Sequence, residues 1–140
     1  MVRTRHGARA KQPGAGHDTH AEAWEARIRV WIVINEHGSL GPGKFKLLEA
    51  IDVTHSLAAA ARRLRMSYRL AWQHLRLIEQ RTGIKMVDRQ RGGSHGGGTE
   101  LTPAGKELLE TYNTFCAHMR DHVQNEFRSR FAVWIAQSNQ

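Results

Sequence analysis

The sequence is short of several residue types, and each shortage excludes a class of protein. It contains one cysteine, Cys116, so no internal disulfide framework can form, and this fits a reducing compartment. No apolar run approaches the roughly 20 residues that a membrane-spanning helix needs. Acidic residues number only 13 against 21 lysines and arginines, which leaves a formal net charge of +8. So basic a small chain is expected to bind a polyanion, either nucleic acid or an anionic membrane.

The N-terminal segment, residues 1–22, is basic and has almost no large apolar side chains. It lacks the apolar region of a secretory signal. Because such a segment cannot offset its ordering entropy with buried surface, we predict a disordered basic tail. Two interpretations of its arginines stay open: they contact phosphate, or, as composition favours, they are merely solvated.

A strand and a helix are predicted between residues 27 and 53. Residues 27–35 alternate in character, which is typical of a strand with two different faces. One face would carry Ile28, Val30, Ile32 and Ile34, and the other Arg29, Trp31 and Val33. The glycines and proline within residues 36–43 predict a loop. A helix is expected over residues 44–53, since its apolar side chains recur three or four residues apart.

Three further helices are marked by their first residues. Ser56 caps an alanine-rich helix that ends near Arg65, and Ser67 caps a helix that ends at Gly83. The last helix begins with the Thr-Pro pair at residues 102–103, where the missing N–H of proline costs nothing. Its apolar repeat carries it almost to the end of the sequence.

The predicted fold class is mainly α with a small β-sheet. Two short strands, residues 84–87 and 99–102, are expected to flank a glycine-rich tip. A pair of apolar helices with a cap between them, followed by a basic hairpin, is the layout of a winged helix-turn-helix. We therefore predict a winged helix-turn-helix with an N-terminal strand over residues 23–113. A long C-terminal dimerisation helix is predicted over residues 114–140.

The helix that begins after Ser67 has the features of a recognition helix. Ala71, Leu75 and Ile78 are spaced to face a core. The other side would then contact DNA, through Ser67, Tyr68, Arg69, Trp72, Gln73 and Arg76. Arginine and glutamine make bidentate bonds to base edges, and tyrosine donates to phosphate. A solvated face is an equal alternative for Arg76, and Trp72 either contacts DNA or packs under the wing.

The predicted wing and its flanks supply the remaining DNA contacts. These are Ser56, Arg89, Arg91, Ser94 and His95, with Arg91 expected to bind phosphate. A nucleotide-binding loop is the other use of such glycines. No Lys-Ser/Thr pair follows them, and they precede a strand rather than a helix, so this alternative is not favoured.

The last helix carries an apolar stripe too long for the winged domain to cover. The stripe comprises Phe115, Met119, Val123, Phe127, Phe131 and Trp134. Either a second copy buries it or the helix breaks and folds back, and we predict a homodimer. His118, His122 and Glu126 have a spacing that can seat a metal. Because no further ligands accompany them, we expect an exposed polar stripe and no metal.

Several short runs of the sequence form a recognisable set. They are Gly41 to Gly43, Leu47 to Ile51, Ala59 to Ala61, Met66 to Arg69 with Ala71 and Trp72, Gly92 and Gly93 with Gly96 to Gly98, and Leu101 and Thr102 with Gly105. Together they resemble the N-terminal DNA-binding domain of ModE-type molybdate-responsive regulators, and more distantly the LysR-type winged helix. The resemblance covers about half the chain. It implies a homodimeric, sequence-specific transcriptional regulator that binds double-stranded DNA in the bacterial cytoplasm.

The sequence departs from that family in two places. Full-length ModE-type regulators carry C-terminal modules that bind molybdate, and the residues after the last predicted helix leave no room for them. The resemblance thus implies DNA binding and dimerisation without molybdate sensing, and no cofactor. His55 stands where the family usually has glycine, which is expected to alter the loop before Ser56.

Two other functions stay open. A molybdenum-metabolism accessory protein would bind an oxyanion or cofactor through the dimer groove, without binding DNA. An interaction module would dock on a separate effector-sensing protein and bind DNA only with that partner. Neither a membrane partner nor an enzyme is expected, since no Ser-His-Asp order, paired carboxylates or reactive-cysteine motif stands out.

Overall fold

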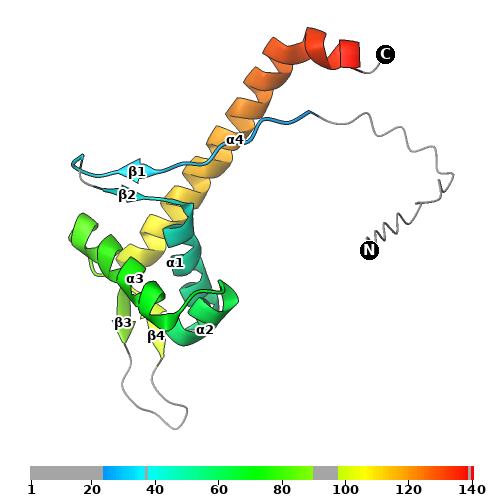
Figure 1. The fold of residues 1–140 in the computed structure, drawn as a ribbon. Coiled ribbons are helices and arrows are strands. Elements are labelled where there is room, and N and C mark those ends of the chain that lie inside the picture. The colour runs from blue at the N-terminus through cyan, green and yellow to red at the C-terminus, as the bar shows by residue number, and fades with distance from the viewer. Residues whose placement is uncertain (1–23, 37, 90–97, 139) are drawn as a thin grey trace, which may run out of the picture.

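The computed structural model describes residues 24–36, 38–89, 98–138 and 140, so the predicted tail at 1–22 lies outside the described residues. The elements run in the order β1 (Ile32–Val33), β2 (Ser39–Leu40), α1 (Pro42–Thr54), α2 (Leu57–Arg63), α3 (Tyr68–Thr82), β3 (Val87–Arg89), β4 (Thr99–Leu101) and α4 (Pro103–Ser138). The first three helices pack together, and α4 leads away from them (Figure 1). The predicted class, mainly α with a little β-structure, is confirmed, although the strands form two separate antiparallel pairs.

The core lies where the three short helices meet the first turns of α4. Its most deeply buried large side chains are Leu40, Leu47, Leu48, Ile51, Ile78 and Met86. The predicted inner face of α3 is confirmed, since Ala71, Leu75 and Ile78 are buried. The buried alanines Ala60 and Ala61 leave room for the neighbouring helices to approach closely.

Side-chain caps begin three of the helices, as predicted. The Oγ atoms of Ser56 and Ser67 each accept a backbone N–H three residues later, at 3.1 Å. Thr102 Oγ1 accepts the N–H of Gly105 at 3.0 Å and donates to the carbonyl of Lys85 at 2.7 Å. Each cap satisfies an N–H that has no partner within its helix, which stabilises the helix by about 1 kcal/mol. The caps therefore set where α2, α3 and α4 begin.

The ends of α1 and α2 place non-glycine residues in the left-handed region. Arg65 has φ 55°, and the next N–H, of Met66, bonds to the carbonyl of Ala61 at 3.0 Å. This Schellman arrangement ends α2 at Arg63, slightly before the predicted end, and turns the chain into α3. His55 has φ 52° at the end of α1. A left-handed residue explains why glycine suits that position in the family that the sequence resembles.

The loop predicted over residues 36–43 is wrong, because these residues hold a strand and the start of a helix. β2 pairs with β1 antiparallel, with Ile32 opposite Leu40. The turn between them passes through Asn35 and Glu36, whose φ values are 52° and 58°. Leu40 is buried in the core, so the chain enters α1 from an anchored strand. The glycines and proline here accompany a hairpin and a helix start.

The strand predicted over residues 27–35 is correct only at Ile32–Val33. Residues 24–31, called the strap from here on, instead run along α4 (Figure 1). The backbone N–H of Ala26 donates to Gln124 Oε1 at 3.4 Å, and the amide of Gln124 donates back to the carbonyl of Ala26. The hydroxyl of Tyr112 donates to the carbonyl of Val30 at 2.8 Å. These bonds give the strap backbone its partners on α4.

The two predicted wing strands are present as β3 and β4, but the first, predicted over residues 84–87, shares only Val87 with β3. β3 pairs with β4 antiparallel, with Val87 opposite Leu101. The backbone carbonyls just before β3 accept hydrogen bonds from Thr102 instead. The Lys85 carbonyl accepts from the Thr102 side chain, and the Met86 carbonyl accepts the Thr102 N–H at 2.9 Å. The segment is thus tied to the start of α4 rather than to a strand.

α4 is one continuous helix of 36 residues, which at about 1.5 Å per residue is ~54 Å long. It does not break and fold back, so that alternative is excluded for the described residues. Gly105, in its first turn, packs against Met86: a Cβ built on it would lie 2.5 Å from the Met86 carbonyl oxygen. Within the described ranges, no helix combines the length and apolar character needed to cross a membrane.

We expect Tyr112→Phe to lower the free energy of unfolding by about 1 kcal/mol, the usual contribution of one hydrogen bond. Burial raises the pKa of Tyr112 to about 12, so its hydroxyl is protonated and can donate to Val30. The ring, stacked on Phe45 with centroids 3.5 Å apart, is kept in the variant. Urea denaturation measures the change. Tyr68→Phe, at an exposed tyrosine, is the control, and equal losses in both variants would contradict the prediction.

Candidate nucleic-acid interface

The outward face of α3 forms an open hollow of about 690 Å³. The hollow is lined by Tyr68, Arg69, Trp72, Gln73, Arg76, Leu77, Gln80 and Arg89. All the side chains predicted on the outer face from Tyr68 to Arg76 are thus brought together. Tyr68 is 51% exposed, and Arg69, Gln73 and Arg76 are exposed. The face therefore offers charged and amide groups free of the core.

Trp72 supports this face from beneath. It is half-buried and packs against the hydrophobic core. The guanidinium carbon of Arg76 lies 4.8 Å from its ring centroid, and that of Arg89 lies 5.7 Å away. At exposed sites such cation–π contacts stabilise the pair by about 0.5–1 kcal/mol, and they hold the arginines over the ring. Trp72 therefore joins α3 to β3, which agrees with the interpretation that it packs under the wing.

The two predicted serines lie at the starts of α2 and α3. Their Oγ atoms already accept an N–H of their own helix. The hydroxyl hydrogen of each serine can therefore donate to an outside acceptor such as phosphate. Ser67 is exposed, whereas Ser56 is half-buried and correspondingly less accessible.

The wing is described only in part. Arg89 is exposed at the end of β3, beside the hollow. Arg91, Ser94 and His95 lie outside the described residues, so their DNA contacts stay predictions. Sequence reasoning missed Leu77 and Gln80 in the hollow. Gln80 follows Gln73 after two helical turns. This spacing is the sequence signal that places Gln80 on the same face of α3.

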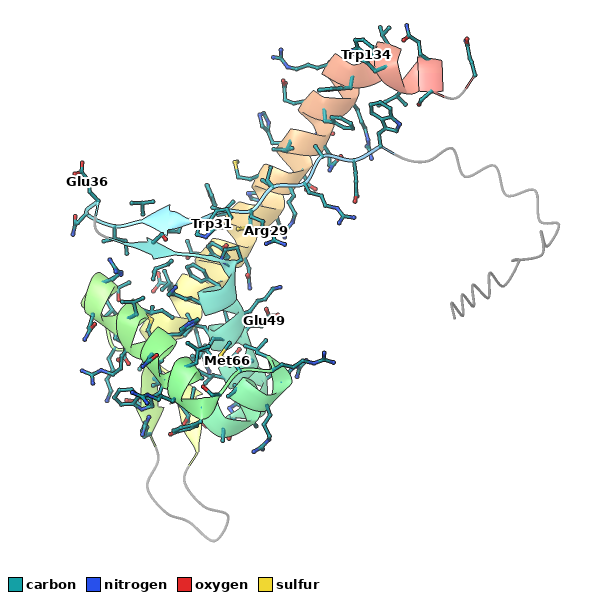
Figure 2. All side chains as sticks on the ribbon, viewed as in Figure 1. Arg29, Trp31, Glu36, Glu49, Met66 and Trp134 are labelled. Atoms are coloured by element: carbon teal, nitrogen blue, oxygen red, sulfur yellow. The ribbon has the colours of Figure 1, made fainter. Side chains whose placement is uncertain are left out.

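The predicted dimerisation residues all lie on α4. Met119, Val123 and Phe127 are half-buried in the middle of the helix. The ends of the stripe are open: Phe115 is 46%, Phe131 43% and Trp134 61% exposed. Figure 2 shows Trp134 near the far end of α4, away from the helix-turn-helix. The stripe predicted from the sequence is therefore partly uncovered in a single chain.

The candidate metal ligands on α4 do not form a site. Among the described residues, no three His, Cys, Asp or Glu side chains gather closely enough to hold a metal ion. Glu126 instead pairs with Arg130 at 2.7 Å. That hydrogen bond and the charge of Arg130 lower the pKa of the Glu126 carboxyl.

This arrangement defines a winged helix-turn-helix domain: α2 and α3 are joined by a tight turn, α3 has an exposed polar face, and β3 and β4 form a two-stranded wing. Residues 43–106 match the family model for the bacterial regulatory helix-turn-helix protein, lysR family. The chain is thus shown to carry a helix-turn-helix DNA-binding domain similar to the N-terminal region of ModE and LysR regulators.

Curated relatives point the same way. The chain is 37% identical over 89 residues to the molybdenum-pterin-binding protein MopB of Rhodobacter capsulatus, covering 63% of this chain and 33% of that protein. It is 34% identical over 86 residues to the transcriptional regulator ModE of Haemophilus influenzae, covering 61% and 34%. The match therefore spans about a third of the length of these relatives. The predicted ModE and LysR resemblance is confirmed.

Among solved structures, a complex of the CbnR DNA-binding domain with DNA is 28% identical, with a TM-score of 0.47. The match covers 64% of this chain and 94% of that domain.

Proposed function

We propose that this chain acts as a homodimeric, sequence-specific DNA-binding transcriptional regulator in the cytoplasm. The observation that carries the proposal is the outward face of α3. There Arg69, Gln73 and Arg76 line one hollow together with Arg89 of β3. Arginine and glutamine are the side chains that read guanine and adenine edges, and α3 has the length and exposure to enter a major groove.

The charge of the whole chain supports a duplex as the partner. A formal charge of +8 attracts the phosphate backbone without reading its sequence. The relative in Haemophilus influenzae is named as a transcriptional regulator. We place Arg89, with the predicted Arg91, Ser94 and His95, at the backbone, and the first turns of α3 at the base edges. Ser56 and Ser67 would donate to phosphates at the starts of their helices.

Dimerisation follows from α4. Its exposed Phe131 and Trp134, which share one side of the helix, would be buried by the same helix of a second copy. A two-fold dimer presents two recognition helices, which bind half-sites about 34 Å apart or a multiple of that distance. The operator is then a pseudo-palindrome.

A salt titration tests DNA binding directly. A gel shift with the DNA upstream of the protein's own gene, repeated over a range of salt, should show affinity that falls steeply as salt rises. Each neutralised phosphate adds about −0.9 to the slope of log affinity against log salt. Arg89→Ala should make the slope shallower by about 1. A slope near zero, or no binding to any duplex at low salt, would sink the proposal.

A further inference from the structure

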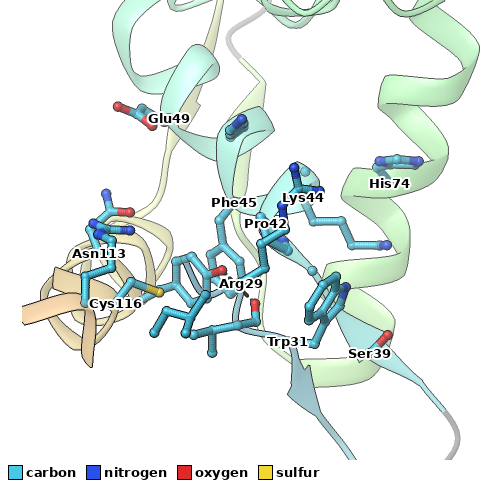
Figure 3. Close-up of a pocket in the computed structure, with 17 residues that line it drawn as sticks. Arg29, Trp31, Ser39, Pro42, Lys44, Phe45, Glu49, His74, Asn113 and Cys116 are labelled. Atoms are coloured by element: carbon cyan, nitrogen blue, oxygen red, sulfur yellow. Dashed lines mark hydrogen bonds between the residues drawn. The ribbon is translucent and has the colours of Figure 1, made fainter. Parts of the chain in front are cut away.

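A second hollow, unrelated to the outward face of α3, lies where the strap meets α1. It is an open cavity of about 850 Å³, lined by the strap, β2, the first turns of α1, His74 of α3 and the middle of α4 (Figure 3). In Figure 1 the start of α1 lies at the end of the domain away from β3 and β4. Nothing in the proposed contact with DNA uses this cavity.

The lining of this cavity is strongly positive. Arg29 comes from the strap, Lys44 and Lys46 from α1, and Arg120 from α4. Among the described residues, none of the four forms a salt bridge. Glu49 is the one carboxylate among the described lining residues, and Figure 3 shows it at the edge, far from Lys44 and His74. Cations from three separate elements thus line one space in which Glu49 is the single carboxylate among the described lining residues.

One polar group in the same cavity is left without a partner among the described residues. His74 Nδ1 is buried and has no hydrogen-bond partner among the described residues. Burial, and then the charge of Lys44, lower the pKa of His74, so its ring is neutral at pH 7 and can donate one hydrogen bond. Gly41 supplies no side-chain cap, so the positive end of the α1 dipole also faces this region.

From this cavity we infer a binding site for a small organic phosphate. Arg29, Lys44 and Arg120 place three positive charges along one cavity, more than the single charge of a carboxylate ligand neutralises, so a dianionic head group fits better. Beside the cations, Val30, Trp31 and Phe45 offer an apolar surface for the rest of the ligand. The volume lies within the range of small-molecule sites, about 300–1,000 Å³. Such a ligand would tie the strap to α1 and α4.

The test uses phenyl phosphate as the probe in isothermal titration calorimetry with the full chain. Phenyl phosphate should bind and raise the midpoint of thermal unfolding. Benzoate, which carries a single charge, should bind about tenfold more weakly, and phenol should not bind at all. The site is overturned if phenyl phosphate does not bind at millimolar concentration, or if benzoate and phenol bind equally well.

Gly43→Asp is the sharpest variant. A Cβ built on Gly43 meets no atom within 4 Å, so the side chain fits without a clash. A carboxylate in the first turn of a helix favours the helix, so the variant should fold. Its charge should weaken phenyl phosphate binding at least about tenfold, while the neutral Gly43→Asn should bind nearly as the natural protein does. Equal losses in both variants would point to shape rather than charge and would contradict the site.

The phosphates of DNA are the other possible source of this chemistry, and Lys44→Gln separates the two. If the cavity binds a small phosphate, the variant weakens phenyl phosphate binding by several-fold and leaves duplex affinity in the gel shift unchanged. If the variant instead weakens duplex binding and leaves phenyl phosphate binding unaltered, the cations serve DNA and the inference is wrong. Because the calorimetry needs no DNA, failure of the proposed function would not affect it.

Discussion

Replacing Phe131 and Trp134 by glutamate should turn a dimer into a monomer and weaken operator binding about 100-fold or more. The two side chains are 43% and 61% exposed in the single chain and lie on the same side of α4. Charges at these positions would have to be buried in a dimer that packs α4 against α4. A monomer contacts one half-site at a time and loses the gain of simultaneous binding, which is about 10²–10⁴.

Ser129→Glu with Ala136→Glu is the matched control. Both positions are exposed on the opposite side of the same helix, and they add the same charge. This pair should stay dimeric by sedimentation and keep its affinity for the operator. A natural protein that sediments as a monomer at micromolar concentration would contradict the dimer, as would unchanged affinity in the Phe131 and Trp134 variant. Truncating α4 is a poorer test, because Gln124 also holds the strap.

The features predicted correctly from the sequence depend on short-range chemistry. A cap needs a hydroxyl and an N–H three residues apart, and Ser56, Ser67 and Thr102 all make that bond. The end of α3 at Gly83, with φ 69°, is equally local. The outward face of α3 follows from helical periodicity once its inner face is known. These signals were enough to predict the helix-turn-helix and most of the hollow that α3 lines.

The features that the sequence did not predict depend on distant partners. The strap alternates as a strand does, but its hydrogen bonds run to α4: Ala26 and Gln124 are 98 residues apart, and Val30 and Tyr112 are 82 apart. Period-2 alternation describes a two-faced extended segment and does not say whether a strand or a helix covers it. The cationic cavity was missed for the same reason, since its charges come from elements that meet only in the fold.

Arg69→Ala and Gln73→Ala should relax the sequence preference of the protein, whereas Arg89→Ala should weaken binding to all duplexes alike. Arg69 and Gln73 lie in the first turns of α3, the part of a recognition helix that reaches base edges. Losing one bidentate base contact should reduce discrimination between operator and a single-base variant by about 1–3 kcal/mol. Arg89 lies on β3 beside Trp72. We expect its charge to contact the DNA phosphate backbone, a contact that carries no sequence information.

Competition gel shifts with operator, single-base variants and random duplex measure the two effects separately. Arg128→Ala is the control for charge, because it removes one exposed arginine from α4, away from the outward face of α3. The Arg128→Ala variant should leave discrimination between operator and single-base variants unchanged. Its affinity for DNA should change by no more than a small factor. The predicted signature is a ratio of operator to random affinity that falls in the α3 variants and holds in Arg89→Ala. If the α3 variants lose operator and random duplex equally, Arg69 and Gln73 contact the backbone, and the bases are read by other residues.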